Sequence, residues 1–197
     1  QAAMMEPMAV AVHAMRRFHI EKDSSVCIIG LGTIGLLLTM FLKAEGIQNV
    51  YVEGNKDMQK HFAQKLGVDD EHYNVDNVVA DYVFECVGKN ETINRAIELA
   101  APAGNIVFVG NPYSDMNISK DTYWKILRKQ LKLSGTWNSS YAGESGDDWH
   151  YVLNMLADGR INPEQFITHL YPLDAIQKGM EIMRDKSEDY VKVMCIS

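Results

Sequence analysis

Between residues 25 and 136, short apolar runs alternate with longer helix-forming segments. Residues 25–29 form an unbroken apolar run after a polar turn, which is typical of a strand buried on both faces of a parallel sheet. Further strands are predicted at 49–53, 81–87 and 105–109, and residues 131–136 are assigned as a sixth strand. Helices are predicted at 7–18, 33–45, 56–66, 91–100 and 122–129.

The alternation predicts an α/β fold, a doubly wound parallel sheet with helices on its faces. It loosens past residue 135, where a loop at 138–146 precedes a helix at 147–157, a strand at 168–171, a helix at 174–184 and a strand at 190–196. We therefore expect an N-terminal helix within 1–24, a sheet domain at 25–137, and a tail at 138–197 that returns to something outside the sheet.

The charge balance argues against nucleic acid or an anionic membrane as a partner, because 19 Lys and Arg face 26 Asp and Glu, a net charge of −7. A small-molecule partner is expected instead. Cys27, Cys86 and Cys195 form no C-x-x-C pair, which fits a reducing cytoplasm. The longest apolar stretch, 31–42, is shorter than the roughly 20 residues of a spanning helix. No membrane segment is expected.

A G-x-G-x-x-G motif at residues 30–35 lies between the first predicted strand and its helix, the context that makes this motif informative. Gly30 would make the tight turn, Gly32 would let the backbone approach a pyrophosphate, and Gly35 would let the helix pack closely on the strand. The helix N-terminus, with Thr33 and Ile34, offers free N–H groups to phosphates. The pattern predicts a Rossmann-type dinucleotide site; a helix packed tightly on a sheet without a ligand is the alternative.

The end of the second strand should decide which dinucleotide binds. If Glu53 points at the adenosine ribose, it would accept hydrogen bonds from the hydroxyls of NAD. If Gly54 occupies that position, the missing side chain leaves room for the 2′-phosphate of NADP, and Asn55 and Lys56 could satisfy its oxygens. Each of these residues could equally be an ordinary strand-end or turn residue.

Several spaced segments resemble the zinc-dependent medium-chain alcohol dehydrogenases, with the closest match to the polyol branch that includes sorbitol and galactitol-1-phosphate 5-dehydrogenases. They are residues 6–14, 30–35, 84–88, 125–129 and 133–137. The resemblance implies hydride transfer between NAD(P) and a polyol or sugar alcohol that is sometimes phosphorylated, with zinc polarising the oxygen; it leaves the particular polyol open.

The resemblance also implies an N-terminal domain that holds the catalytic zinc. The chain starts at Gln1 without a signal-peptide pattern and without the zinc-ligand residues of that domain. We therefore expect a preceding part and no dehydrogenase activity from this chain by itself.

The resemblance assigns roles to further residues. Glu6 matches a glutamate beside the catalytic zinc, although an acid that stabilises a helix N-terminus is an equal alternative. Two strand ends, Cys86, Val87 and Gly88 with Val109, Gly110 and Asn111, would line the nicotinamide half. Trp137 would lie near the nicotinamide and Lys192 near the pyrophosphate.

The chain departs from the family pattern in two places. The ribose carboxylate of the family falls at Gly54, so NADP is favoured, although a one-residue bulge would restore Glu53 and NAD. Residues 68–80 replace a strand and a full helix, so the adenine side should be abbreviated. By the same resemblance, residues 131–136 would pair across a two-fold axis to make a homodimer or a higher oligomer.

Two other functions remain open. A non-catalytic nucleotide-sensing module would keep the glycine turn without a zinc domain. A methyltransferase that uses S-adenosylmethionine shares the fold class, but its glycine turn usually follows a strand that carries an acid, which residues 25–29 lack.

Two clusters outside these motifs have structural interpretations. The Met-rich start, which includes Met4 and Met8, should pack in the core. Asp147 and Asp148 should form a capped, solvated helix start.

Overall fold

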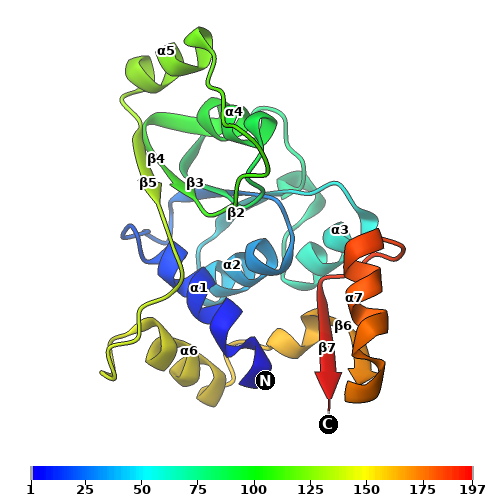
Figure 1. Cartoon of the computed structure of the whole chain (residues 1–197). Coiled ribbons are helices and arrows are strands. Elements are labelled where there is room, and N and C mark those ends of the chain that lie inside the picture. Colours follow the sequence, from blue (N-terminus) through cyan, green and yellow to red (C-terminus); the bar gives the residue numbers. More distant parts are fainter. Residues whose placement is uncertain (1, 197) are drawn as a thin grey trace.

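A computed structural model describes residues 2–196. Gln1 of the predicted segment 1–24 and Ser197 of the predicted tail 138–197 lie outside the described residues. The centre is a parallel five-stranded sheet in the order β2-β1-β3-β4-β5 (Figure 1). Its strands are β1 (Ser25–Ile29), β2 (Asn49–Glu53), β3 (Ala80–Glu85), β4 (Ala100–Phe108) and β5 (Lys132–Gly135). The predicted doubly wound α/β fold is confirmed.

Strand β1 is buried on both faces because its side chains alternate between two apolar clusters. Val26 and Ile28 join the larger cluster, whereas Cys27 and Ile29 join the smaller one. Parallel pairing with β2 and β3 fixes this alternation across the sheet. The strand order turns at β1, and the crevice above the carboxyl ends of β1 and β3 is where ligands bind in sheets of this kind.

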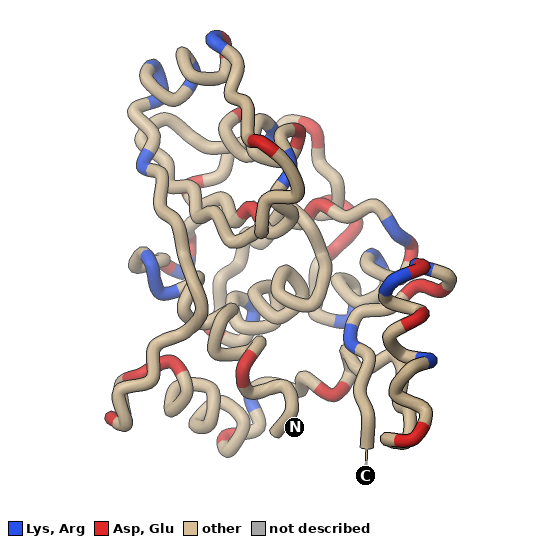
Figure 2. The backbone as a smooth tube through the Cα atoms, in the orientation of Figure 1, with Lys and Arg blue, Asp and Glu red and all other residues tan. Residues whose placement is uncertain are grey.

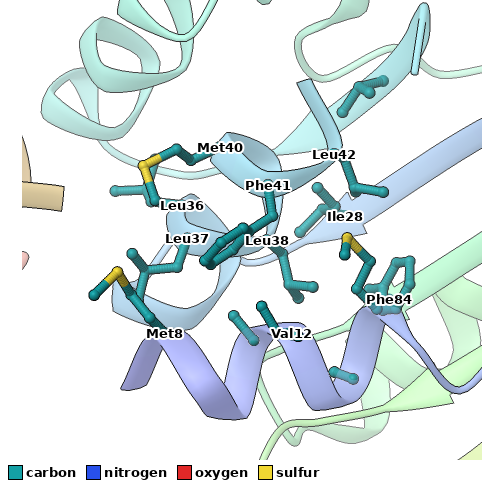
Figure 3. Packing of buried hydrophobic residues seen from close by; sticks show 14 of the residues in the cluster. Met8, Val12, Ile28, Leu36, Leu37, Leu38, Met40, Phe41, Leu42 and Phe84 are labelled. Carbon is teal, nitrogen blue, oxygen red and sulfur yellow. The ribbon is translucent and has the colours of Figure 1, made fainter. Parts of the chain in front are cut away.

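Helices cover both faces of the sheet. The larger cluster joins one face to α1 (Met5–Met15), α2 (Thr33–Ala44), α3 (Asp57–Lys65) and α6 (Asp148–Ala157). Met8 and Val12 of α1 pack beside Leu37 and Phe41 of α2 (Figure 3). The expected core role of Met4 and Met8 is confirmed, since both are fully buried.

The smaller cluster joins the opposite face to α4 (Asn90–Leu99) and to Ile126 of α5 (Lys120–Lys129). Basic and acidic positions are interspersed over most elements, and α5 carries Lys120, Lys125, Arg128 and Lys129 beside one acid, Asp121 (Figure 2). Lys129 of α5 donates to the main-chain oxygens of Ile97, Glu98 and Ala100 at 2.7–3.1 Å. It thereby satisfies carbonyl groups at the C-terminal end of α4.

The chain between α3 and β3 contributes a short 3₁₀ turn, η2 (Asp70–His72), and a single parallel bridge between Val52 and Tyr73. The strand predicted at residues 131–136 is confirmed as β5, but it is the fifth strand of this sheet and not the sixth. The physical reason is that a single bridge to β2 replaces a strand at that edge. The abbreviation expected at residues 68–80 is present.

The C-terminal part leaves the main sheet. After α6 come η3 (Pro163–Phe166), β6 (Ile167–Pro172), η4 (Leu173–Ala175), α7 (Ile176–Asp185) and β7 (Lys192–Ile196). Strands β6 and β7 form a separate two-stranded parallel sheet. None of the helices within residues 2–196 has the length and apolar character that crossing a membrane requires.

The start of α6 is capped as predicted, because Asp147 accepts the main-chain N–H of His150 at 2.8 Å. The prediction that this pair of acids is solvated is wrong, since Asp147 and Asp148 are both buried. Asp148 accepts from His13 at 2.8 Å and from Arg16 at 3.1 Å. Hydrogen-bond donors on α1 and at its C-cap therefore compensate for the burial of this carboxylate.

Candidate nucleotide site

The carboxyl ends of β1, β2 and β3 border a pocket of about 460 Å³. Seven residues singled out from the sequence line it: Gly30, Gly32, Glu53, Gly54, Asn55, Cys86 and Val87. Lining residues that the sequence analysis missed are Ile29, Leu31, Gln59, Asn74, Lys89, Thr92 and Tyr113. Residues from the glycine turn and from the ends of β2 and β3 therefore meet at one cavity.

The glycine turn has the steric form of a phosphate cradle. Gly30 has a φ of +95°, which favours glycine, and a Cβ at Gly35 would lie 1.9 Å from the Gly30 carbonyl oxygen. No heavy atom lies within 4 Å of a Cβ placed on Gly32. The backbone of Gly32 therefore faces open space at the N-terminus of α2, where free N–H groups favour an anion.

The remaining residues of the turn support it from behind. Ile34 packs against the larger apolar cluster. The Thr33 hydroxyl donates to the main-chain oxygen of Val191 at 2.6 Å. This contact brings Val191, the residue before β7, to the glycine turn. Lys192 follows Val191 in the sequence but does not line the pocket.

Glu53 lines the pocket at the end of β2, but its carboxylate is paired. Arg95 of α4 reaches Glu53 Oε1 through Nε at 2.8 Å and through its terminal nitrogen at 2.6 Å. The hydrogen bond with Glu53 raises the pKa of Arg95, so the guanidinium stays charged. The main-chain oxygen of Glu53 accepts the Gly30 N–H at 2.9 Å.

Gly54 is held on both sides by one side chain. Asn74 Oδ1 accepts the Gly54 N–H at 2.9 Å, and Asn74 Nδ2 donates to the Gly54 carbonyl at 2.8 Å. A Cβ at Gly54 would lie 2.7 Å from Tyr73 Oη and 2.8 Å from Gln59 Oε1. The ends of two flexible side chains therefore occupy the space beside Gly54.

The next two residues diverge. The Asn55 N–H donates to Gln59 Oε1 at 2.9 Å, which holds the loop at the pocket rim. Lys56 Nζ pairs with Asp189 at 2.6 Å and does not line the pocket. Lys56 would have to leave Asp189 to contact a phosphate in the pocket.

The buried carboxylate of Glu85 organises the far wall. Its Oε1 accepts the N–H groups of Val87 and Gly88 at 2.8 and 2.9 Å. Its main-chain oxygen accepts those of Val109 and Gly110 at 2.8 and 2.9 Å. The two predicted strand ends are thus tied to one residue that the sequence analysis did not select as a site residue.

The strand ends are packed backbone to backbone. A Cβ at Gly88, whose φ is +81°, would lie 2.1 Å from the Asn111 carbonyl oxygen. Gly88, Val109, Gly110 and Asn111 do not line the pocket; Gly88 packs against Gly110 and Asn111, and Val109 packs against the larger apolar cluster. Burial raises the pKa of the Cys86 thiol, which favours its protonated form.

Two predicted residues lie elsewhere. Trp137 follows β5, is 73% exposed and does not line the pocket. Glu6 is exposed in the first turn of α1. Within residues 2–196, no three His, Cys, Asp or Glu side chains converge as metal ligands. The described residues do not by themselves make a zinc site.

The missed residues carry weak sequence signals. Asn74 lies in a loop, and its one special feature is a left-handed backbone with a φ of +53°. Lys89 and Thr92 open α4, and the Thr92 hydroxyl donates to the Lys89 carbonyl at 3.0 Å. Their position after the third predicted strand, at the carboxyl edge of the sheet, could have identified them.

Comparison with known proteins assigns the family. The family described as zinc-binding dehydrogenases matches residues 33–158. The chain belongs to this family. A galactitol 1-phosphate 5-dehydrogenase from Escherichia coli is 27% identical over 180 residues, which cover 85% of this chain and 52% of that protein. A sorbitol dehydrogenase from Halalkalibacterium halodurans is also 27% identical, over 98% of this chain and 57% of its own length.

The fold is shared with solved dehydrogenases. A zinc-binding dehydrogenase from Sinorhizobium meliloti, described as bound to NADP, has a TM-score of 0.84 at 23% identity. The match covers 99% of this chain and 58% of that one. The chain thus spans about half the length of the dehydrogenases it matches.

Proposed function

We propose that this chain is the dinucleotide-binding part of a longer zinc-dependent dehydrogenase that oxidises a polyol or sugar alcohol, in some cases phosphorylated, to a ketose. The observation that carries the proposal is the glycine turn, which opens onto a pocket at the strand-order switch of the sheet. Relatives named for galactitol 1-phosphate and sorbitol support the substrate class.

The residues present fit a nicotinamide dinucleotide. The backbone of Gly32 and the start of α2 would hold the pyrophosphate, because no Cβ blocks the approach there. Glu53, Gly54 and Asn55 would border the adenosine ribose, and Cys86 and Val87 would bound the pocket on the β3 side. When bound, the nicotinamide ring supplies hydride transfer. This chain supplies position and shape.

Within this proposal, NADP is the favoured cofactor. Gly54 has no side chain and Glu53 is held by Arg95, so no free carboxylate faces the ribose position.

Isothermal titration calorimetry of the chain with NADP, NAD and S-adenosylmethionine tests the proposal. We expect NADP to bind more tightly than NAD and S-adenosylmethionine not to bind. Binding of NAD at least about tenfold tighter than NADP, a difference of about 1.4 kcal/mol, would make Glu53 the ribose ligand. Tight binding of S-adenosylmethionine without NAD(P) binding would refute the dehydrogenase assignment.

In the longer protein, this chain would bind the dinucleotide and another segment would hold the zinc. An isolated two-stranded parallel sheet such as β6–β7 is unusual, because parallel strands are normally covered on both faces within larger sheets. We infer that a preceding segment completes it, holds the zinc with Glu6 nearby, and receives the tail at 138–197. An assay with zinc, NAD(P) and a polyol panel should show no turnover for this chain.

The proposal extends to assembly and location. Strand β5 is an edge of the sheet, and Leu133 on it and Leu127 on α5 are exposed. We propose that two copies pair along β5 to make a homodimer. We also propose a cytoplasmic location, where Cys27, Cys86 and Cys195 stay free thiols.

A further inference from the structure

Arg95 connects three parts of the chain at the ribose end of the pocket. It binds Glu53 Oε1 at 2.6 and 2.8 Å, and it donates to the main-chain oxygens of Val75 and Asp76 at 3.1 and 3.3 Å. Both side chains of the ion pair are largely covered, with 29% of Arg95 and 18% of Glu53 exposed. The carboxylate is therefore fixed in one place by α4 and by the loop that replaces the absent strand.

Glu53 determines the charge of this end of the pocket. It is the one carboxylate among the lining residues that the structure describes, and the exposed Lys89 is the one lysine or arginine. Arg95 itself does not line the pocket, and in the intact ion pair its charge offsets that of Glu53. The charges of the paired Arg95 and Glu53 sum to zero, whereas an unpaired Glu53 would present a full negative charge to the pocket.

Paired and unpaired Glu53 would give the pocket different relative affinities for NAD and NADP. A free carboxylate accepts hydrogen bonds from the two ribose hydroxyls of NAD and repels the charged 2′-phosphate of NADP. A carboxylate whose Oε1 is already bound by a guanidinium accepts less readily from the ribose hydroxyls and repels the 2′-phosphate less strongly. The position of the ion pair at the ribose end thus bears on selectivity and not only on stability.

We propose that Arg95 is a positioning residue that sets the selectivity between NADP and NAD by holding and neutralising Glu53. The inference rests on the proposed function, because it requires a dinucleotide in this pocket. It adds a residue on α4, away from the glycine turn and the end of β2, to the elements that determine cofactor choice.

The test measures the dissociation constants of NADP and NAD by calorimetry at low salt for the chain and three variants: Arg95→Met, Glu53→Gln and the double variant. Arg95→Met should raise the ratio of the NADP constant to the NAD constant at least about tenfold, because one unpaired charge is exposed to the 2′-phosphate. Glu53→Gln should lower that ratio, since Arg95 is then uncompensated. The double variant should return it close to the value of the parent.

A purely structural role for Arg95 gives a different pattern. Loss of the contacts to Val75 and Asp76 would weaken both dinucleotides together and lower the melting temperature, and Glu53→Gln would not restore binding in the double variant. Lys125→Met, which removes a cation whose ion pair with Glu98 lies outside the pocket, controls for the change in net charge.

Several outcomes overturn the inference. An unchanged ratio in both Arg95→Met and Glu53→Gln, with binding retained, overturns it and leaves the proposed function intact. If Arg95→Met does not fold, Glu53→Gln serves as the test. Its amide oxygen can still accept the hydrogen bonds of Arg95, so the contact is kept while the negative charge is lost. An unchanged ratio in Glu53→Gln would then overturn the inference. Absence of any dinucleotide binding by the parent chain overturns the proposed function and this inference with it.

Discussion

Gly110 lies directly against the backbone of Gly88: a Cβ at Gly110 would come within 2.2 Å of the Gly88 amide nitrogen. Backbone atoms cannot move aside as the end of a flexible side chain can. The close approach therefore holds the loop after β4 against the loop after β3, beside the pocket.

Gly110→Ala should lower the free energy of unfolding by about 1–3 kcal/mol, the range for forced overpacking. Urea unfolding measures the change. Gly146→Ala is the matched control, because a Cβ there meets no atom within 4 Å and Gly146 has no positive φ. The control should stay within about 0.5 kcal/mol of the parent. Equal losses in both variants would contradict the packing argument.

Asn74 should matter for stability and for dinucleotide binding, because both of its amide groups hold Gly54. Asn74→Gly removes two hydrogen bonds without backbone strain and should reduce stability by about 1–2 kcal/mol. Asn74→Ala adds the strain of a Cβ at a φ of +53°, roughly 1 kcal/mol more. Thermal melting and NADP titration check both variants. Wild-type affinity in Asn74→Gly would show that Gly54 needs no fixation.

Lys129 should stabilise the chain more than its neighbour Lys125, although both are lysines of α5. Lys129 satisfies three carbonyl groups, whereas Lys125 makes an ion pair with Glu98 at 2.7 Å in which both side chains are substantially exposed. Lys129→Met should reduce the free energy of unfolding by about 1.5–3 kcal/mol. Lys125→Met should reduce it by less than about 1 kcal/mol. The reverse order in urea unfolding would show that the cap on α4 is unimportant.

Asp147 should make stability depend on pH on the acid side. Burial acts to raise its pKa, but hydrogen bonds from the main chain and side chain of His150 and from the Ala142 N–H outweigh it, so the pKa lies well below the usual range. A carboxylate with a depressed native pKa stabilises the fold above its unfolded pKa, and this contribution is lost as pH falls toward the native pKa.

Melting temperatures between neutral pH and about pH 2 test this linkage. Asp147→Asn should melt lower than the parent at neutral pH, and the difference should shrink as the pH falls through the acid range. Asp158→Asn, an exposed acid at the other end of α6, is the control and should run parallel to the parent. A constant difference at every pH would assign the effect of Asp147→Asn to packing.

The exposed edge of β5 predicts association. Sedimentation at micromolar concentration should show a dimer of the chain. Leu133→Lys, which puts a charge on this edge, should weaken the dimer at least about tenfold, since edge lysines oppose strand pairing. Leu153→Lys replaces a leucine of α6 that is similarly exposed, 49% against 42% for Leu133, and should leave the dimer intact. A monomeric parent chain would contradict the proposed assembly.

The sequence predicted best where one strand or helix determines its own pattern. The bounds of β1 and β2 match the predicted 25–29 and 49–53, because each is a short apolar run between polar turns. The glycine turn was found because its spacing and its place between strand and helix are both local. Burial of Asp148 was missed, since its partner His13 is 135 residues away along the chain.

The end of the pocket at β2 shows the same limit. Glu53 and Gly54 were selected by their distance from the glycines, but Arg95, 42 residues after Glu53, leaves no periodic signal that links it to them. Asn74 lies in the loop where an expected strand is replaced by one bridge, so its contact with Gly54 depends on how that loop folds back. Pairings of this kind depend on tertiary structure.

The hydrogen bond from Thr33 to Val191 joins residues 158 positions apart. During translation, the segment with β1, the glycine turn and α2 leaves the ribosome long before Val191 is made, and N-terminal units fold first. The hydroxyl of Thr33 therefore has a different partner, water or a neighbouring group, in the nascent chain. In a ribosome-bound chain stalled before Val191, the first residue of α2 would lack the hydrogen bond that it makes in the complete fold.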